Sequence, residues 1–246
     1  MKKIISLLLL LMLAASVNAK ELQPQEMKMQ LQSLDNYVVS LDFQDDTLVD
    51  VRQSFDVVNR FREPIIPGRA KLILVGDIRP TDISISIGWS RKGLADENVI
   101  LEDGNYVIYY EIWRPITKGE KLDVTVDFTT ELNPQGILFK QLNLNFGEPE
   151  IPIEKMALNL NLPSGKSLTY ANPEAESAES GSVMIEIPRS LIKQYQEEPI
   201  TVEYSSLPLP TLPFNGYWLW LVLIVMSAMI MMMKILSKKS MEPAAV

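Results

Sequence analysis

Apolar and polar residues alternate along most of the chain between residues 20 and 214. A period of two with one polar face is the pattern of a half-buried antiparallel β-sheet. Only residues 189–197 have the apolar spacing of a helix. The sequence therefore predicts an all-β fold, with strands expected at residues 27–33, 37–43, 47–58, 70–75, 83–87, 105–113, 122–128, 142–146, 156–162, 183–187 and 200–205.

Turn-forming residues separate these strands, among them Asp103 with Gly104 and Lys118 with Gly119. Many short strands at this spacing predict an antiparallel β-sandwich, either one elongated sandwich or two packed sandwiches. Prolines interrupt the pattern near residue 147. We therefore expect one sandwich over residues 20–146. A second β-rich unit over residues 147–206 should pack on the first, because so few strands rarely form a core alone.

The first 19 residues have the pattern of a secretory signal peptide. Two lysines precede an apolar run over residues 4–15, and Val17 and Ala19 place small residues before the expected cleavage point. Cleavage is expected between Ala19 and Lys20. An uncleaved anchor is the alternative, but a run of about 12 residues is too short to span a ~30 Å hydrocarbon core.

A second apolar run near the other end predicts a transmembrane helix over residues 215–236. Residues 217–233 carry no charge, and extension to residue 236 gives a helix of about 30 Å. The alternative is a buried core helix. Aromatic residues prefer one membrane interface and lysines favour the cytoplasmic side, and the run is flanked in this way by Tyr217, Trp218 and Trp220 and by Lys234, Lys238 and Lys239.

These signals predict a single-pass protein of the cell membrane, with the β-rich part outside and residues 237–246 in the cytoplasm. Such a tail is too short to fold, so a signal would have to pass through a partner. Residues 207–214 contain three prolines and are expected to form an extended spacer. The lipid bilayer is thus the first expected partner.

The chain contains no cysteine and no histidine. This composition excludes disulfides, zinc–thiolate and iron–sulfur sites, and catalysis that depends on a thiol or an imidazole. Acidic residues number 31 against 23 basic ones, for a formal net charge of −8. A surface with this balance repels phosphate backbones, so nucleic acid is not an expected partner.

Four aspartates, Asp42, Asp45, Asp46 and Asp50, lie within nine residues. Oxygen-only ligands suit calcium, which makes these carboxylates the candidate metal site. The spacing does not match an EF-hand loop, because neither the glycine at the sixth position nor the glutamate at the twelfth is present. A polar hairpin between two strands is the alternative explanation.

Four aromatic residues, Tyr106, Tyr109, Tyr110 and Trp113, share one expected strand. Alternation puts Tyr106 with Tyr110 on one face, and Tyr109 with Trp113 on the other. Apolar residues on both faces are typical of a central covered strand. The alternative is that one aromatic row forms a platform for a ligand.

No motif for a nucleophilic serine or a phosphate-binding loop occurs, and no cofactor is expected. We therefore predict a protein that is not an enzyme but an extracytoplasmic binding or scaffolding module for another envelope protein or a surface polymer. Two alternatives remain: a hydrolase that uses carboxylates, and a co-receptor subunit that signals through a partner.

The predicted topology can be tested with protease added to intact right-side-out cells. Residues 20–214 should be digested while the tail is protected, because only the former face the outside. Protection of the β-rich part with cleavage of the tail would show the opposite orientation.

Overall fold

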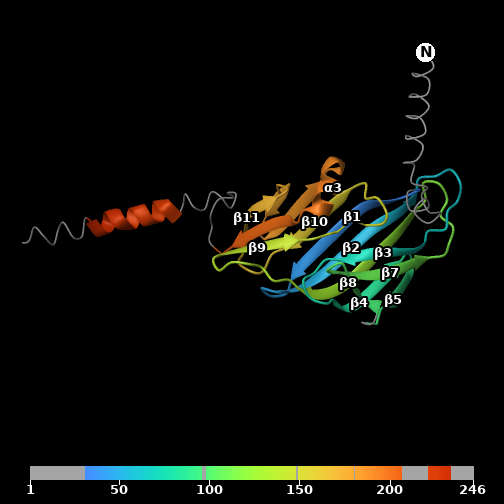
Figure 1. The fold of residues 1–246 in the computed structure, drawn as a ribbon, viewed down its shortest axis with the longest axis horizontal. Helices are drawn as coiled ribbons and strands as arrows, with labels where there is room; N and C mark the ends of the chain where they lie inside the picture. Colours follow the sequence, from blue (N-terminus) through green and yellow to red (C-terminus); the bar gives the residue numbers. More distant parts are fainter. Residues whose placement is uncertain (1–30, 96–97, 148, 180, 207–220, 234–246) are drawn as a thin grey trace, which may run out of the picture.

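The computed structural model describes residues 31–95, 98–147, 149–179, 181–206 and 221–233 (Figure 1). The predicted all-β character is confirmed, since strands dominate these residues. The strands are β1 (Gln32–Phe43), β2 (Leu48–Asn59), β3 (Gly68–Leu74), β4 (Thr81–Ile87), β5 (Ser90–Gly93), β6 (Ile100–Glu102), β7 (Asn105–Ile112), β8 (Lys121–Glu131), β9 (Phe139–Leu144), β10 (Met156–Asn161), β11 (Ser167–Asn172), β12 (Ser177–Glu179), β13 (Ser182–Ile187) and β14 (Ile200–Ser205).

Eight strands form one large sheet in the order β12-β13-β10-β1-β2-β8-β4-β5. The expected antiparallel pattern holds at every pair of this sheet except one, because β1 runs parallel to β10. A parallel pair needs a long connection between its strands, and here that connection contains β2 to β9. The pair brings strands from both expected units into one sheet.

Two three-stranded sheets, β3-β7-β6 and β11-β14-β9, pack on the same face of the large sheet. The Phe55 ring of β2 lies 5.8 Å from that of Tyr110 on β7, and the Phe43 ring of β1 lies 6.1 Å from that of Tyr204 on β14. In Figure 1, β3 and β7 lie toward the right and β9 and β11 toward the left, with β1 and β2 between them.

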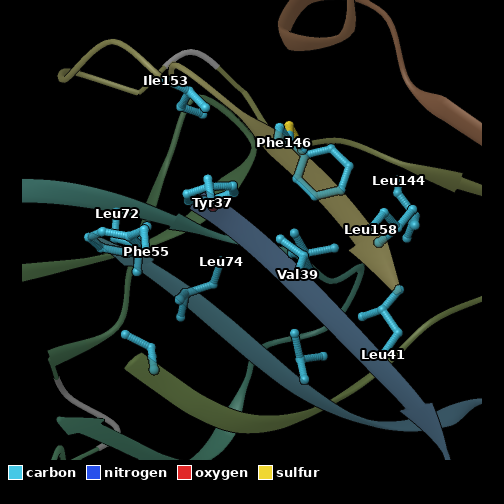
Figure 2. Close-up of a cluster of buried hydrophobic side chains, with 14 of the residues drawn as sticks. Tyr37, Val39, Leu41, Phe55, Leu72, Leu74, Leu144, Phe146, Ile153 and Leu158 are labelled. Carbon is cyan, nitrogen blue, oxygen red and sulfur yellow. The ribbon is translucent and has the colours of Figure 1, made fainter. Parts of the chain in front are cut away.

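The buried side chains of all three sheets form one hydrophobic core. Figure 2 shows Tyr37, Val39 and Leu41 of β1 in the middle of this core. Phe55, Leu72 and Leu74 lie on one side of β1, and Leu144, Phe146 and Leu158 lie on the other (Figure 2). Because β1 contributes to both sides, the core is continuous from one small sheet to the other.

A bulge in β1 keeps its apolar residues on the core side. The pairing with β2 shifts between Asp35 and Val38, and Asn36 takes a positive φ of 49°. The strands expected at residues 27–33 and 37–43 are therefore one element in the structure, and residues 27–30 lie outside the described part of the chain. Beyond the bulge, alternate residues are buried as far as Phe43.

The helix expected at residues 189–197 is confirmed as α3 (Arg189–Glu197). Pro188 precedes it, where its fixed φ suits a helix start. The side chains of Ile192 and Tyr195 are buried against the core, and the Tyr195 hydroxyl donates to Asn172 Oδ1 over 2.9 Å. The helix thus closes the end of the second small sheet.

A buried asparagine ties the loops at one end of the domain together. Asn59 Nδ2 donates to the carbonyl oxygens of Glu63 at 2.8 Å and Ile116 at 2.9 Å, and Asn59 Oδ1 accepts from the backbone N–H of Phe61 at 2.7 Å. Its side chain is 1% exposed. All of its polar atoms thus have partners, as a buried amide requires.

The alternation also predicts which residues face the core. Ile83, Ile85, Val124, Val126, Leu158, Leu160 and Leu162 belong to the set expected inside, and all are buried. Ile87 belongs to the same set but is only partly buried, because it ends β4 at the margin of the sheet.

Replacing Ile85 by Asp should unfold the protein, because the new carboxylate would be buried without a partner. Thermal melting of the purified full chain in detergent measures the effect. Ser86→Asp is the matched control, since Ser86 points to the opposite, polar face of β4. Equal melting temperatures for the two variants would contradict the assignment of faces.

Candidate functional site

The face of the large sheet that lies opposite the two small sheets is polar. Residues at the outward positions of neighbouring strands include Asp50 and Arg52 on β2, Asp127 on β8 and Asn159 on β10. These positions follow from the period of two, because each flanks residues that face the core. The outer face thus presents a continuous array of hydrogen-bonding groups.

This face is hollowed. The hollow has a volume of about 720 Å³ and is partly open to solvent. Seven strands contribute to it, and its walls carry four aspartates, two arginines and several hydroxyl and amide groups. It is lined by Ser40, Leu41, Asp42, Asp50, Val51, Arg52, Asp82, Ser84, Arg91, Asp127, Phe128, Thr129, Asn159, Asn161 and Ser182.

Asp127 sits between the two arginines of the hollow. Its carboxylate is 2.6 Å from Arg52 Nε and 3.7 Å from an Arg91 nitrogen. The arginine side chains are 65% and 69% exposed. Exposed ion pairs contribute only about 0–1 kcal/mol, so little free energy holds the two guanidinium groups on Asp127. Arg91 also donates to Ser84 Oγ over 3.0 Å.

The structure brings only part of the aspartate cluster into the hollow. Asp42 and Asp50 face each other across β1 and β2 and line the hollow. Asp50 accepts from Gln44 Nε2 at 2.5 Å and from Thr129 Oγ1 at 2.8 Å. The carboxylate therefore already has two donors from the protein.

Asp45 serves the turn between β1 and β2. Its carboxylate accepts from the backbone N–H groups of Leu48 at 2.6 Å and Thr47 at 2.7 Å, and these bonds lower the pKa of Asp45. Across the described residues, no three acidic side chains are grouped in a way that could hold a metal ion. The two backbone bonds give Asp45 a structural role in the turn of the hairpin.

The aromatic strand divides between the core and the surface. Tyr110 is buried against Phe55, and burial raises the pKa of Tyr110. Tyr106 is partly buried and packs on the same core. These two rings share one face of β7, as the alternation predicts, and that face is turned to the core.

Tyr109 lies on the opposite face of β7 within a charged network. Arg69 stacks over its ring at 4.0 Å, and its hydroxyl donates to Glu102 at 2.9 Å. Lys71 Nζ also lies 3.2 Å from Glu102. The hydrogen bond from Tyr109 is the main cause that lowers the pKa of Glu102, and it raises the pKa of Tyr109.

Trp113 follows β7 and is 68% exposed, and its indole nitrogen donates to Glu111 at 2.9 Å. A second hollow, of about 340 Å³, lies between β4, β5 and β7. Its lining includes Tyr109, Tyr110 and Glu111 but not Trp113. The four aromatic residues thus do not form one platform: two rings pack on the core, one is held by charges and one is exposed.

The membrane and signal residues named from the sequence lie outside the described residues: Ala19, Lys20, Tyr217, Trp218, Trp220, Lys234, Lys238 and Lys239. Of the expected span at 215–236, the structure describes a helix at residues 221–233. Within the described part of the chain, no helix has both the length and the apolar character needed to cross a bilayer.

Sequence reasoning singled out Asp42 and Asp50 but missed the rest of the hollow. The alternation does identify Arg52, Asp127 and Asn159 as outward residues. It carries no signal for the order of the strands, and only the pairing of β1 with β10 and of β2 with β8 brings these side chains to one surface.

No family model matches the sequence. The uncharacterized protein MJ1395 of Methanocaldococcus jannaschii is 30% identical over 133 residues, which are 53% of this chain and 89% of that protein. The chain belongs to the same family as MJ1395. Because that relative is itself uncharacterized, family membership transfers no activity.

Solved structures of an M1 zinc metallopeptidase from Deinococcus radiodurans are also similar in part. A mutant bound to a Tyr-Ser-Ala substrate matches with 11% identity and a TM-score of 0.42 over 71% of this chain, and another structure of the enzyme with 13% identity and the same TM-score over 72%. The chain spans 42% of the length of those chains. A similarity of this extent supports no inference about function.

Replacing Tyr110 by Ala should destabilise the protein by about 3–5 kcal/mol, the range for large aromatic residues truncated in a core. Trp113→Ala should change stability by less than about 0.5 kcal/mol, as expected for a surface position. Denaturant unfolding of both variants measures the difference. A large loss from Trp113→Ala would show that its ring is covered in the folded protein.

Proposed function

We propose that this protein is a membrane-anchored, extracytoplasmic binding module. Its β domain binds a polar ligand, a surface polymer or an envelope protein, on the outer face of the large sheet. The observation that carries this proposal is the hollow of about 720 Å³, whose lining residues come from seven strands. An array of this kind offers many hydrogen bonds on a scaffold that the core holds rigid.

The lining of the hollow indicates the chemistry of the ligand. Phe128 is the single aromatic residue of the lining and is 3% exposed, so the hollow has no exposed aromatic ring on which a ligand could stack. Four aspartates and two arginines instead offer both acceptors and donors. Such a surface suits a ligand that carries hydroxyl, amide or charged groups, and its open shape suits an extended segment.

The domain architecture is proposed to be two packed β-sandwiches that share the large sheet. The two small sheets cover the core side of that sheet, which supports this description. Because both small sheets lie on the same face of the large sheet, the opposite face of the large sheet remains open to a ligand.

The helix at residues 221–233 supports the proposed anchor. Every side chain in it is exposed, although its sequence is apolar apart from Ser227. A helix that is apolar on all sides is typical of a membrane span or of a buried core, and this one does not pack on the β domain. Together with the N-terminal signal pattern, this supports the proposal that the binding surface lies outside the cell.

The proposal can be tested with the full chain reconstituted in nanodiscs and incubated with solubilised envelope material. Asp127→Asn combined with Arg52→Gln should weaken capture of the ligand at least about tenfold, equivalent to 1.4 kcal/mol. Asp103→Asn is the matched control, because Asp103 lies in the turn between β6 and β7 and does not line the hollow. Mass spectrometry and glycan analysis identify the captured material.

Two outcomes would contradict this function. Capture that survives the double variant but is lost with Tyr109→Ala would move binding to the outer face of β7. Turnover of a glycan or peptide that one carboxylate variant abolishes would show that the domain is a hydrolase.

A further inference from the structure

Two adjacent aliphatic side chains project from the β domain between β8 and β9. Ile137 is 92% exposed and Leu138 is 67% exposed. Large aliphatic residues on a soluble surface are usually scattered singly, and a contiguous apolar protrusion marks a surface that something covers. The pair lies outside the hollow and has no part in the proposed ligand binding.

The backbone around this pair is held in a short hairpin. Gln135 and Gln141 exchange two backbone hydrogen bonds of 2.8 Å, which closes the loop at its base. Gly136 has a φ of 99°, and a Cβ atom at that position would lie 2.1 Å from the carbonyl oxygen of Phe139. Only glycine fits this conformation. The exposure of the apolar tip is therefore built into the hairpin.

The hairpin lies where the chain leaves the β domain. The hydroxyl of Ser205, the last residue of β14, donates to the Leu138 carbonyl oxygen over 2.8 Å, and Phe139 is opposite Ser205 in the sheet. In Figure 1, β14 (orange) ends beside the start of β9, at the left end of the domain. The ten residues 207–216 separate this end from the uncharged run that starts at Tyr217.

The length of that connection limits how far the bilayer can be. Ten residues span at most about 36 Å when fully extended. The end of the domain that carries Ile137 and Leu138 is therefore the end nearest the proposed anchor. The connection is therefore short enough to allow the apolar tip to reach the membrane surface.

We propose that Ile137 and Leu138 enter the interfacial region of the bilayer and orient the β domain on the membrane. This proposal rests on the membrane anchoring proposed above. The proposed contact is apolar, because the charged groups at this end of the domain are of both signs. Burial is the main cause that raises the pKa of Tyr204 to about 12, and the nearby Asp46 carboxylate adds to it. Glu131 ends β8, but Lys140 is opposite Tyr204 in the sheet and Lys166 Nζ donates to Ser206 Oγ over 2.9 Å. These mixed charges give no net basic patch, so we expect no strong attraction to anionic lipids.

Because the chain has no cysteine, a single introduced cysteine can be labelled specifically. The full chain carrying Ile137→Cys is labelled with an environment-sensitive fluorophore and reconstituted into phosphatidylcholine vesicles. Lipids with a quencher near the headgroup should reduce its emission roughly twofold or more, since interfacial side chains reach about 5–10 Å into the membrane. Raising the salt concentration to about 1 M should leave this quenching unchanged, because salt screens charges and not apolar contact.

Trp89→Cys is the matched control. Trp89 is fully exposed and apolar like Ile137, but it follows β4, whose last residue Ile87 is opposite Val124 near the start of β8. The hairpin lies beyond the other end of β8, so a label at position 89 should stay in water and show no quenching.

Flotation of the same vesicles separates the two proposals. A chain that floats while the label at position 137 remains unquenched overturns the bilayer contact and leaves the anchor standing; a protein would then have to cover the apolar pair. Quenching that disappears at high salt also overturns it. A chain that does not float overturns the membrane anchor and the contact together.

Discussion

The pairing of β1 with both β2 and β10 is the constraint on which the rest of the structure depends. β2 precedes and β10 follows the boundary expected near residue 147, so this one strand joins both parts of the chain in a single sheet. Tyr37, Val39 and Leu41 on its inner face contact the hydrophobic core on both sides (Figure 2). Loss of either pairing would divide the core and expose the inner faces of both small sheets to water.

The polar hollow is a consequence of the same packing. Successive residues of a strand point to opposite faces, so burying Val51 and Val126 directs Arg52 and Asp127 outward. The bulge at Asp35–Val38 preserves this division along β1, since an uncorrected slip of one residue would exchange the two faces. Both small sheets lie on the core side, so the outer surface remains open.

The geometry at the ends of the strands links the domain to its proposed anchor. β8 ends, β9 begins and β14 ends within one small region, where backbone bonds hold the hairpin of residues 135–141 against Ser205. The turn between β1 and β2 is nearby, because the Leu132 N–H donates to the Thr47 carbonyl oxygen over 2.9 Å. Hydrogen bonds between these loops and strands thus hold the proposed membrane-facing end of the domain in place.

The sequence by itself determined the fold class, the helix at 189–197 and the inward residues of most strands, because alternation is a local property that burial on one face imposes. It left open which aromatic row of β7 is covered, since both faces of that strand carry apolar residues. In the structure, Phe55 packs on Tyr110, so the covered face of β7 is the one that carries Tyr110. Strand order, the parallel β1–β10 pair and the hollow were decided only by tertiary structure. They depend on pairing between strands more than 100 residues apart, for which the alternation within each strand carries no signal.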